Sequence, residues 1–388
     1  MTIEITIRNK PIKGNVLIAK YDSGNPPQIL NGAVFAVYRD VNGDKKFTNG
    51  TDELLGNMTE SSAGIHEYKD LLYGDYLTRE IKAPEGYTVD RNYYAFSIKK
   101  DGETVKVGNN ADGNFYNKDI KGNIEGVKVG ESDEPLSGAV IGLFSDGESE
   151  FTAENALAAV TTEKDGKFIF KDIVYGKYIV AEIESPEGYI LTEKTFPVSV
   201  STDNEVITVK ISNEKIKGNI EGIKVGESDE PLNGAVIGLF ADGESDLTNR
   251  NALGTVTTDE NGKFVFENVE YGKYIIAEIQ PPEGYILTNQ IYPVEISQNT
   301  QISITIVNVK IKGIVEIEKY DSLTDEKLSG AEFTVFTDTN GNGKFDEGEQ
   351  YGVLEEVETG LYRLENIPYG SYFLKETKSP DGYYIDDN

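Results

Sequence analysis

The chain has 388 residues and a formal charge of −30, the balance of 67 acidic and 37 basic side chains. This charge argues against nucleic acid and anionic membranes as partners, because both would repel the chain. The sequence has no cysteine, which excludes disulfide bonds and thiolate metal sites, and its single histidine, His66, leaves little room for histidine-based catalysis or zinc binding. We expect His66 to be a surface or strand residue without a chemical role.

The first predicted element is a strand in residues 2–9, TIEITIRN, where isoleucine alternates with other residues and the segment ends at Asn9. The same ending, an asparagine five residues before a glycine, returns at Asn117, Asn213 and Asn308. Residues 1–9 are therefore predicted to be the closing strand of a preceding domain. We also find no signal peptide, sorting signal or long apolar run, so we expect the sequence to be a piece of a longer protein.

Four copies of one repeat follow this strand. Each copy has a Tyr-Gly-x-Tyr motif, a glutamate seven residues after the first tyrosine, and a Pro-[Glu/Asp]-Gly-Tyr turn whose proline lies eleven residues after that tyrosine. Short Val-, Ile-, Thr-, Tyr- and Phe-rich runs between Gly, Asn, Asp and Pro predict antiparallel sandwiches, and only residues 152–158 and 249–252 have a weak helical pattern. The copies are placed at residues 10–120, 121–216, 217–312 and 313–388.

Each complete copy places a lysine, a glutamate and an asparagine on the apolar side of its strands. Alternate residues of a strand share a face, so Ile317 and Lys319 lie together in GIVEIEKYD, and Ile211 and Asn213 lie together in ITVKISN. One interpretation is a buried polar cluster, or strand-end groups that reach solvent. The other is a reactive cluster, which the recurrence at fixed offsets favours.

Burial would make such a cluster reactive. It shifts a lysine toward its neutral amine and a glutamate toward its protonated acid, because desolvation disfavours both charged forms. A neutral amine held against an asparagine can attack the carboxamide carbon while the acid shuttles protons and ammonia leaves. The product is a Lys–Asn isopeptide bond, formed once per site, so the chain is not expected to be an enzyme in the usual sense and the reaction needs no cofactor.

The motifs Leu-x-Gly-Ala, Tyr-Gly-x-Tyr and Glu-x-x-Pro-[Glu/Asp]-Gly-Tyr resemble those of Cna B-type domains, the immunoglobulin-like stalk modules of Gram-positive surface adhesins and pilins. The resemblance covers essentially the whole chain and implies an all-β fold of tandem sandwiches in an elongated rod. It also implies that lysine in the first strand joins asparagine in the last, with a glutamate as catalytic acid. The positions carried over are Lys20, Glu80 and Asn117; Lys128, Glu182 and Asn213; and Lys224, Glu278 and Asn308. Of these, Asn117 fits least well, because its strand is short of the alternation seen elsewhere.

The fourth copy has Lys319 and Glu376 but no closing strand. We predict head-to-tail strand complementation, in which residues 2–9 of another molecule complete this copy and Asn9 faces Lys319. Two alternatives stay open. Asn388 could supply the partner, or residues 2–9 could be disordered or loosely docked at an arbitrary boundary.

Residues 338–349 of the fourth copy fit the twelve-residue D-x-[DN]-x-[DN]-G-x5-E loop that binds Ca²⁺. A solvated acidic turn is the alternative. The first copy has a degraded version, with Lys45 where glycine is expected, and a plain loop is favoured there. The predicted calcium ligands are Asp338, Asn340, Asn342, Asp346 and Glu349, with the carbonyl oxygen of Lys344.

These features together predict an extracellular structural stalk on the surface or cell wall of a Gram-positive bacterium. Its expected partners are neighbouring domains or copies of the same protein, and this piece is not expected to insert into a membrane. Two other functions stay open: a binding module for host matrix protein or glycan, and accessory domains of a secreted hydrolase. The 23 tyrosines are expected to pack in cores and turns.

Overall fold

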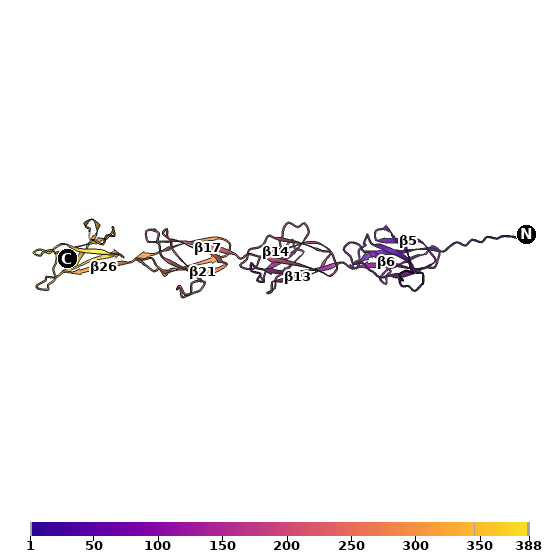
Figure 1. Cartoon of the computed structure of the whole chain (residues 1–388), viewed down its shortest axis with the longest axis horizontal. Coiled ribbons are helices and arrows are strands. Elements are labelled where there is room, and N and C mark those ends of the chain that lie inside the picture. The colour runs from indigo at the N-terminus through magenta and orange to yellow at the C-terminus, as the bar shows by residue number, and fades with distance from the viewer. Residues whose placement is uncertain (1, 345, 386–388) are drawn as a thin grey trace. The chain divides into compact units, whose positions relative to one another are not determined.

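The computed structural model describes residues 2–344 and 346–385 and divides into two compact units, Met1–Glu214 and Lys215–Asn388. Within each unit the strands form two successive sandwiches (Figure 1). We call them sandwich 1 (10–120), sandwich 2 (121–216), sandwich 3 (217–312) and sandwich 4 (313–388). The expected all-β fold is confirmed, since the described residues contain one helix only, the 3-10 turn η1 (Glu347–Glu349). Residues 152–157 and 249–252 form turns and irregular chain, and Ala158 begins strand β12, so their weak helical pattern was misleading.

Sandwich 1 packs the sheet β4-β5-β1-β8 against the sheet β3-β2-β6-β7, and β9 also pairs with β1. The closing strand is thus divided into β8 and β9, which explains why the sequence before Asn117 lacks a continuous alternation. A core that includes Val16, Phe35 and Phe115 fills the space between the sheets. The strands are β1 (Lys13–Asp22), β2 (Val34–Arg39), β3 (Glu53–Asn57), β4 (Thr59–Ser62), β5 (Ile65–Leu72), β6 (Gly74–Lys82), β7 (Tyr94–Ile98), β8 (Thr104–Lys106) and β9 (Phe115–Asn117).

Sandwich 2 packs the sheet β13-β10-β16 against the sheet β12-β11-β14-β15. The first strand, β10, runs parallel to the last, β16, over eight residue pairs from Gly122 to Val129. The other strand pairs of this sandwich, β10–β13, β11–β12, β11–β14 and β14–β15, are antiparallel. The strands are β10 (Lys121–Val129), β11 (Val140–Ser145), β12 (Ala158–Thr161), β13 (Lys167–Val174), β14 (Gly176–Glu184), β15 (Thr195–Val200) and β16 (Glu205–Ser212).

Sandwich 3 repeats this arrangement, with the sheet β20-β17-β24 against β19-β18-β21-β23 and a short pair, β22 with β25. The first and last strands, β17 and β24, again run parallel. The strands are β17 (Lys217–Val225), β18 (Val236–Ala241), β19 (Gly254–Thr257), β20 (Lys263–Glu270), β21 (Gly272–Gln280), β22 (Tyr285–Ile286), β23 (Ile291–Ile296), β24 (Gln301–Val307) and β25 (Val309–Lys310).

Sandwich 4 has two sheets of three strands, β26-β30-β29 and β28-β27-β31. Its first strand, β26, is an edge strand, and among the described residues no parallel strand accompanies it. Its apolar cluster is small and includes Phe333, Val335 and Tyr362. The strands are β26 (Lys312–Glu318), β27 (Glu332–Thr337), β28 (Gln350–Val353), β29 (Glu355–Glu358), β30 (Leu361–Pro368) and β31 (Tyr372–Lys378).

The two tyrosine motifs have defined structural roles. In sandwich 1, the hydroxyl of the second tyrosine, Tyr76, donates to the carbonyl oxygen of Leu72 at 2.6 Å, and the other sandwiches repeat this i to i−4 contact. In the Pro-Glu-Gly-Tyr turn, the Tyr87 nitrogen donates to the Pro84 oxygen, and Gly86 has φ +83°. A type II turn needs this positive φ at its third residue, which explains the glycine.

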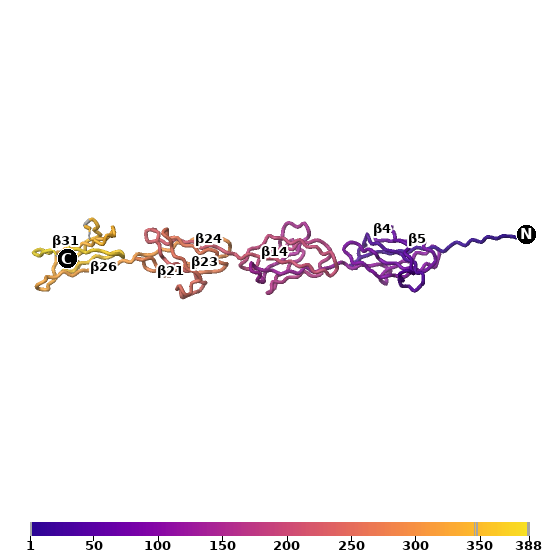
Figure 2. Tube along the Cα trace, viewed as in Figure 1, coloured from indigo at the N-terminus to yellow at the C-terminus, as the bar shows by residue number. Residues whose placement is uncertain are grey.

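Residues 2–9 do not form a strand within the chain. The segment leads away from the first sandwich without pairing with a sheet (Figure 2). Ile3, Ile5 and Ile7 are 78%, 80% and 82% exposed, so none of the described residues covers the apolar face that the alternation predicted.

His66 lies in strand β5, and the surface position allowed for it is wrong. The side chain is 1% exposed and its ring packs against that of Phe35, with the centroids 5.1 Å apart. Burial lowers the pKa of His66, which favours its neutral form.

Candidate functional site: buried lysine, glutamate and asparagine clusters

The parallel pairing of first and last strands brings lysine and asparagine together. Lys128 on β10 lies opposite Ile211 on β16, and Asn213 follows two residues later, on the same face. Lys224 lies opposite Ile306 in the same way, two residues before Asn308. In sandwich 1 the corresponding pair is Lys20 and Phe115, two residues before Asn117.

The glutamate comes from the opposite sheet. Glu80, Glu182 and Glu278 lie on β6, β14 and β21, each paired to the second strand of its sandwich. In each case a backbone nitrogen ten residues further on donates to Oε2 of the carboxyl group. The donors are Asp90 at 2.8 Å, Thr192 at 3.0 Å and Thr288 at 3.0 Å. The sequence did not predict these backbone hydrogen bonds to the glutamates, because any residue type except proline can supply a backbone N–H donor.

In sandwich 2 the three groups are in mutual contact. Lys128 Nζ donates to Asn213 Oδ1 and lies 3.2 Å from Glu182 Oε1. Asn213 Nδ2 donates to both carboxyl oxygens of Glu182, at 2.9 Å each. The side chains of Lys128 and Glu182 are fully buried, and Asn213 is 2% exposed. The amine therefore faces the amide oxygen, while the carboxyl group faces the amide nitrogen.

Sandwich 3 has the same geometry. Lys224 Nζ donates to Asn308 Oδ1 and lies 3.4 Å from Glu278 Oε1. Asn308 Nδ2 donates to the two oxygens of Glu278, at 2.8 and 3.0 Å. The near-identical sequences of sandwiches 2 and 3 thus produce near-identical clusters.

Sandwich 1 brings the same residue types together, but the lysine is displaced. Asn117 Nδ2 donates to the Glu80 oxygens at 2.9 and 3.0 Å, as in the other sandwiches. Lys20 Nζ instead lies 4.0 Å from Glu80 and donates to the backbone oxygens of Tyr21 and Phe115. Asn117 Oδ1 is buried and has no hydrogen-bond partner in the described structure. It is the group that the lysine contacts in sandwiches 2 and 3.

Burial sets the protonation of these groups. Desolvation lowers the pKa of Lys20 to about 8, although the nearby carboxylates of Glu80, Asp90 and Asp22 raise it in part. Burial also lowers the pKa of Lys128 and of Lys224. The pKa of Glu80 is raised by burial, against the hydrogen bond from the Asp90 backbone. Each shift favours the uncharged form.

Sandwich 4 holds only part of a cluster. Lys319 Nζ lies 2.8 Å from Glu376 Oε2, and the lysine side chain is 20% exposed, compared with 0% in the other sandwiches. No asparagine joins this pair among the described residues. Asn388, one of the partners considered from the sequence, lies outside them, and Asn9 belongs to the unpaired segment that precedes sandwich 1.

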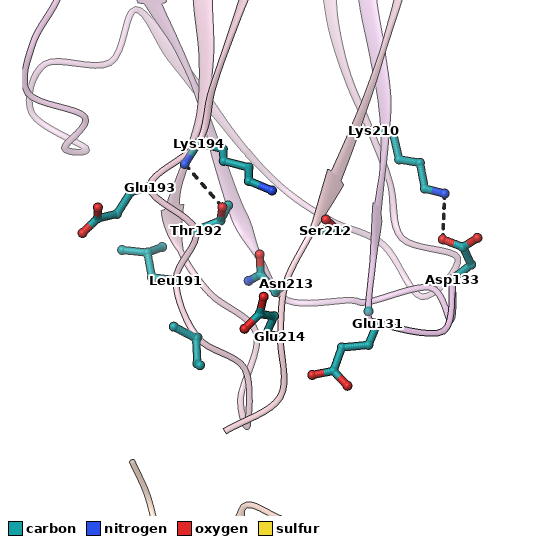
Figure 3. A pocket seen from close by; sticks show the side chains of 12 residues that line it. Glu131, Asp133, Leu191, Thr192, Glu193, Lys194, Lys210, Ser212, Asn213 and Glu214 are labelled. Carbon is teal, nitrogen blue, oxygen red and sulfur yellow. Dashed lines mark hydrogen bonds and ion pairs between the residues drawn. The ribbon is translucent and has the colours of Figure 1, made fainter. Parts of the chain in front are cut away.

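One surface pocket of sandwich 2 reaches its cluster. Asn213 lines this pocket together with Leu191, Thr192 and Ser212 (Figure 3). Lys210 and Asp133 form an ion pair of 2.7 Å at its edge. Asn213 therefore lies between this pocket and the buried cluster.

The predicted calcium loop of sandwich 4 is folded by its own hydrogen bonds. The carboxylate of Asp338 accepts from the backbone nitrogens of Asn342 and Gly343, at 3.0 and 2.9 Å. Glu349 Oε1 accepts from the Asn340 nitrogen, whereas Glu349 Oε2 is buried without a partner in the described structure. Among the described residues, no group of three or more His, Cys, Asp or Glu side chains is arranged to hold a metal ion.

The degraded loop of sandwich 1 is saturated internally. Asp40 accepts from the backbone nitrogens of Gly43 and Lys45, and both oxygens of Asp52 accept from the backbone nitrogens of Val41 and Thr48. These contacts are what a plain folded loop requires.

The comparisons with known proteins identify the family. A family profile described as "SpaA: Prealbumin-like fold domain" matches residues 14–111, 122–215, 218–310 and 313–388. The chain belongs to this family, with one match for each sandwich. The expectation of tandem Cna B-type domains is confirmed.

Three similar proteins come from Gram-positive bacteria. Serine-aspartate repeat-containing protein F of Staphylococcus epidermidis is 30% identical over 273 residues, which cover 62% of this chain and 16% of that protein. Serine-aspartate repeat-containing protein D of Staphylococcus aureus is 26% identical over 394 residues, covering 87% of this chain and 28% of that protein. The solved structure of the Bacillus anthracis TIE protein has a TM-score of 0.62 and 27% identity, and covers 77% of this chain and 51% of that one. The chain thus spans less than a third of the length of both curated relatives.

The protonation of the Lys20–Glu80 pair generates a pH prediction. Cross-linking needs a neutral amine and a protonated acid, so the pair must hold one proton in total. That proton is lost as the pH rises through the Lys20 pKa of about 8. For a chain with Lys128→Arg and Lys224→Arg that is isolated unfolded and unreacted and then folded for the first time, we expect the rate of ammonia loss in sandwich 1 to fall by about tenfold per pH unit above this pKa, measured by mass spectrometry of quenched samples.

The rate of folding, followed by circular dichroism on the same samples, is the control. If ammonia loss instead became faster from about pH 8 to about pH 10, the acid would have no part in the step.

Proposed function

We propose that the chain is a structural stalk segment of a Gram-positive cell-surface adhesin or pilin, whose sandwiches 1–3 stiffen themselves with Lys–Asn isopeptide bonds. The observation that supports this most strongly is the contact of a buried lysine amine with a buried asparagine amide oxygen in sandwiches 2 and 3, beside a buried glutamate. An extracellular location fits the family and the absence of cysteine. The described residues contain no helix that is long and apolar enough to cross a membrane.

The proposed reaction balances within each cluster. The neutral Nζ of Lys128 attacks Cγ of Asn213, and the bond between Cγ and Nδ2 breaks. Glu182 faces Nδ2, so its carboxyl proton passes to the leaving group, which departs as ammonia. The carboxylate then takes the proton that the amine gives up. Glu80 and Glu278 have the same role in their clusters, and Lys20 must first turn from the Phe115 carbonyl toward Asn117.

The bond would change the path of tension through each sandwich. Lys128 is near the end of the first strand and Asn213 directly follows the last, and the two strands are parallel. Tension entering along β10 would cross at the bond and leave the sandwich, so residues 129–212 would carry none of it. Unfolding under load would then require breaking a covalent bond.

The two rival functions have less support. A host-matrix or glycan module needs a binding site, but the near-duplicate sequences of sandwiches 2 and 3 are more typical of spacers than of a binding tip. Accessory domains of a secreted hydrolase would need a catalytic domain elsewhere in the full protein. Neither function accounts for the recurrence of a buried lysine, glutamate and asparagine at equivalent strand positions.

The mass of the intact chain tests the bonds. We expect it to fall short of the sequence mass by three ammonia molecules, one for each of sandwiches 1–3. Lys224→Arg keeps the charge but removes the nucleophile, so it should restore one ammonia. It should also lower the unfolding temperature of sandwich 3 by on the order of 20 °C, because a closed loop of this length contributes about 4 to 5 kcal/mol.

Lys319→Arg is the matched control, because sandwich 4 has no asparagine partner among the described residues. In the monomeric chain it should change neither the mass deficit nor the unfolding of sandwich 3. An intact chain with the full sequence mass would refute the proposal.

Sandwich 4 is the proposed acceptor of a strand from a second copy. Strand β26 is an open edge where β10 and β17 each have a parallel neighbour, and Ile314 on it is 61% exposed. Residues 2–9 supply the matching alternation, with three exposed isoleucines and Asn9 at the end. Paired in the register of sandwiches 2 and 3, Asn9 would face Lys319 across the two molecules.

Denaturing gels test this complementation. We expect covalent oligomers that increase with protein concentration and disappear in Asn9→Ala and in Lys319→Arg. Arg8→Ala is the control, because its side chain points away from the shared face and the ladder should persist. Oligomers that survive Asn9→Ala would show that another group is the partner.

Calcium binding by residues 338–349 is the remaining proposal for sandwich 4. The buried Glu349 Oε2 without a partner supports it, as do the amide and carboxylate oxygens of Asp338, Asn340 and Asn342, which keep free lone pairs. Because the carboxylates of the described residues do not converge on one point, calcium binding would have to move Asp346 and Glu349 inward.

Calorimetry tests the calcium proposal. The wild-type chain should release or absorb heat on titration with Ca²⁺, and Asp338→Ala should not, because it removes the first ligand of the loop. Glu365→Ala, a carboxylate outside the loop, should titrate like the wild type. Equal heats from all three proteins would assign the signal to the general negative charge.

A further inference from the structure

The first tyrosine of the Tyr-Gly-x-Tyr motif is not a core residue. In sandwich 2 this residue is Tyr175, which reaches back to the Pro-Glu-Gly-Tyr turn of sandwich 1. Its hydroxyl donates to Glu85 Oε1 at 2.7 Å. Its ring lies on the open face of Gly86, where an added Cβ would meet the ring at 3.4 Å.

The contact is repeated between sandwiches 3 and 4, within the other unit. Tyr369 donates to Glu283 Oε1 at 3.0 Å, and a Cβ added to Gly284 would lie 2.9 Å from its ring. The glycine thus serves two needs. It supplies the positive φ of the turn, +83° and +82° in the two cases, and it leaves a flat face for the ring of the next sandwich.

The linker residue between two sandwiches forms backbone hydrogen bonds to both of them. The Ile120 nitrogen donates to the Gly86 oxygen of sandwich 1, and the Ile120 oxygen accepts from the Tyr175 nitrogen of sandwich 2, at 2.8 and 2.9 Å. Ile311 makes the same two bonds, with Gly284 and Tyr369, at 2.9 Å each. A linker residue whose donor and acceptor are both engaged has little freedom to act as a hinge.

We propose that the first motif tyrosine, the Pro-Glu-Gly-Tyr turn and the linker isoleucine form an interdomain clasp that fixes the angle between sandwiches 1 and 2 and between sandwiches 3 and 4. The turn of one sandwich is the docking surface, and its partner is the tyrosine of the next sandwich in the chain. Stiffness between the sandwiches then comes from noncovalent contacts, separate from the bonds proposed inside each one.

The chain contains an internal control for this proposal. Tyr73 occupies the equivalent position in sandwich 1, and its nitrogen donates to the Ile12 oxygen as in the two clasps. Its side chain is 59% exposed, and its hydroxyl has no hydrogen bond in the described structure. A change at Tyr73 therefore removes the same atoms without removing a clasp.

Pulsed electron spin resonance between two labels measures the joint directly. The chain has no cysteine, so Thr59→Cys in β4 and Lys171→Cys in β13, both at exposed strand positions, can be labelled without side reactions. We expect a single narrow distance distribution for the parent protein. Tyr175→Phe, which removes the hydroxyl, and Glu85→Ala, which removes its acceptor, should each broaden it, whereas Tyr73→Phe should not.

Thermal unfolding of each variant shows that the sandwiches themselves remain intact. Broadening in either Tyr175→Phe or Glu85→Ala, with Tyr73→Phe unchanged, supports the clasp. Unchanged widths in both variants, or an equal broadening in Tyr73→Phe, would overturn it.

Discussion

The structure depends on burying a lysine amine next to a carboxyl group and a carboxamide. An isolated ammonium group in an apolar core is costly, and a buried ion pair recovers that cost only with close geometry and full hydrogen bonding. In sandwiches 2 and 3 the geometry is close, because the amine donates to the asparagine amide oxygen and lies 3.2 and 3.4 Å from the glutamate carboxyl group. Converting the amine to an amide would then remove the charge from the core altogether. Burial, which makes the unreacted cluster costly, is thus also the feature that would make the proposed reaction favourable.

The four sandwiches differ in how much of the closing strand pairs with the first strand, and the contacts of the buried lysine differ accordingly. Sandwiches 2 and 3 have a continuous closing strand, and their lysines meet the asparagine amide oxygen. Sandwich 1 divides its closing strand into β8 and β9, and Lys20 turns to a backbone carbonyl instead. Sandwich 4 has no closing strand in the described chain, and Lys319 becomes partly exposed. The completeness of the parallel strand therefore sets how closely the reactive atoms approach.

Much of this could be predicted from the sequence because the side-chain period of a strand is two. The alternation in ITVKISN placed Asn213 on the core face, and the alternation in KYIVAEI did the same for Glu182. The Tyr-Gly-x-Tyr motif was found in the sequence, but the contacts of its two tyrosines were not predicted. The structure shows that the second tyrosine bonds within its own sandwich, whereas Tyr175 and Tyr369, each the first tyrosine of its motif, bond to the preceding sandwich. A sequence cannot show which hydroxyl finds a partner in the next sandwich.

Other features depended on tertiary packing. His66 is buried because β5 packs beside Phe35. This contact joins residues far apart in the sequence, so no local pattern predicts it. The segment 2–9 has the alternation of a strand, yet a strand forms only where another strand pairs with it, and none of the described strands pairs with this segment. The anchors of the glutamates are backbone nitrogens, which carry no residue signature.

Peptide mapping of the folded protein tests the central claim most directly. After proteolysis, the account predicts branched peptides that join Lys20 to Asn117, Lys128 to Asn213 and Lys224 to Asn308, each lighter by one ammonia than its two linear parts. Linear peptides containing intact Lys128 and Asn213, or Lys224 and Asn308, as the main products would contradict it.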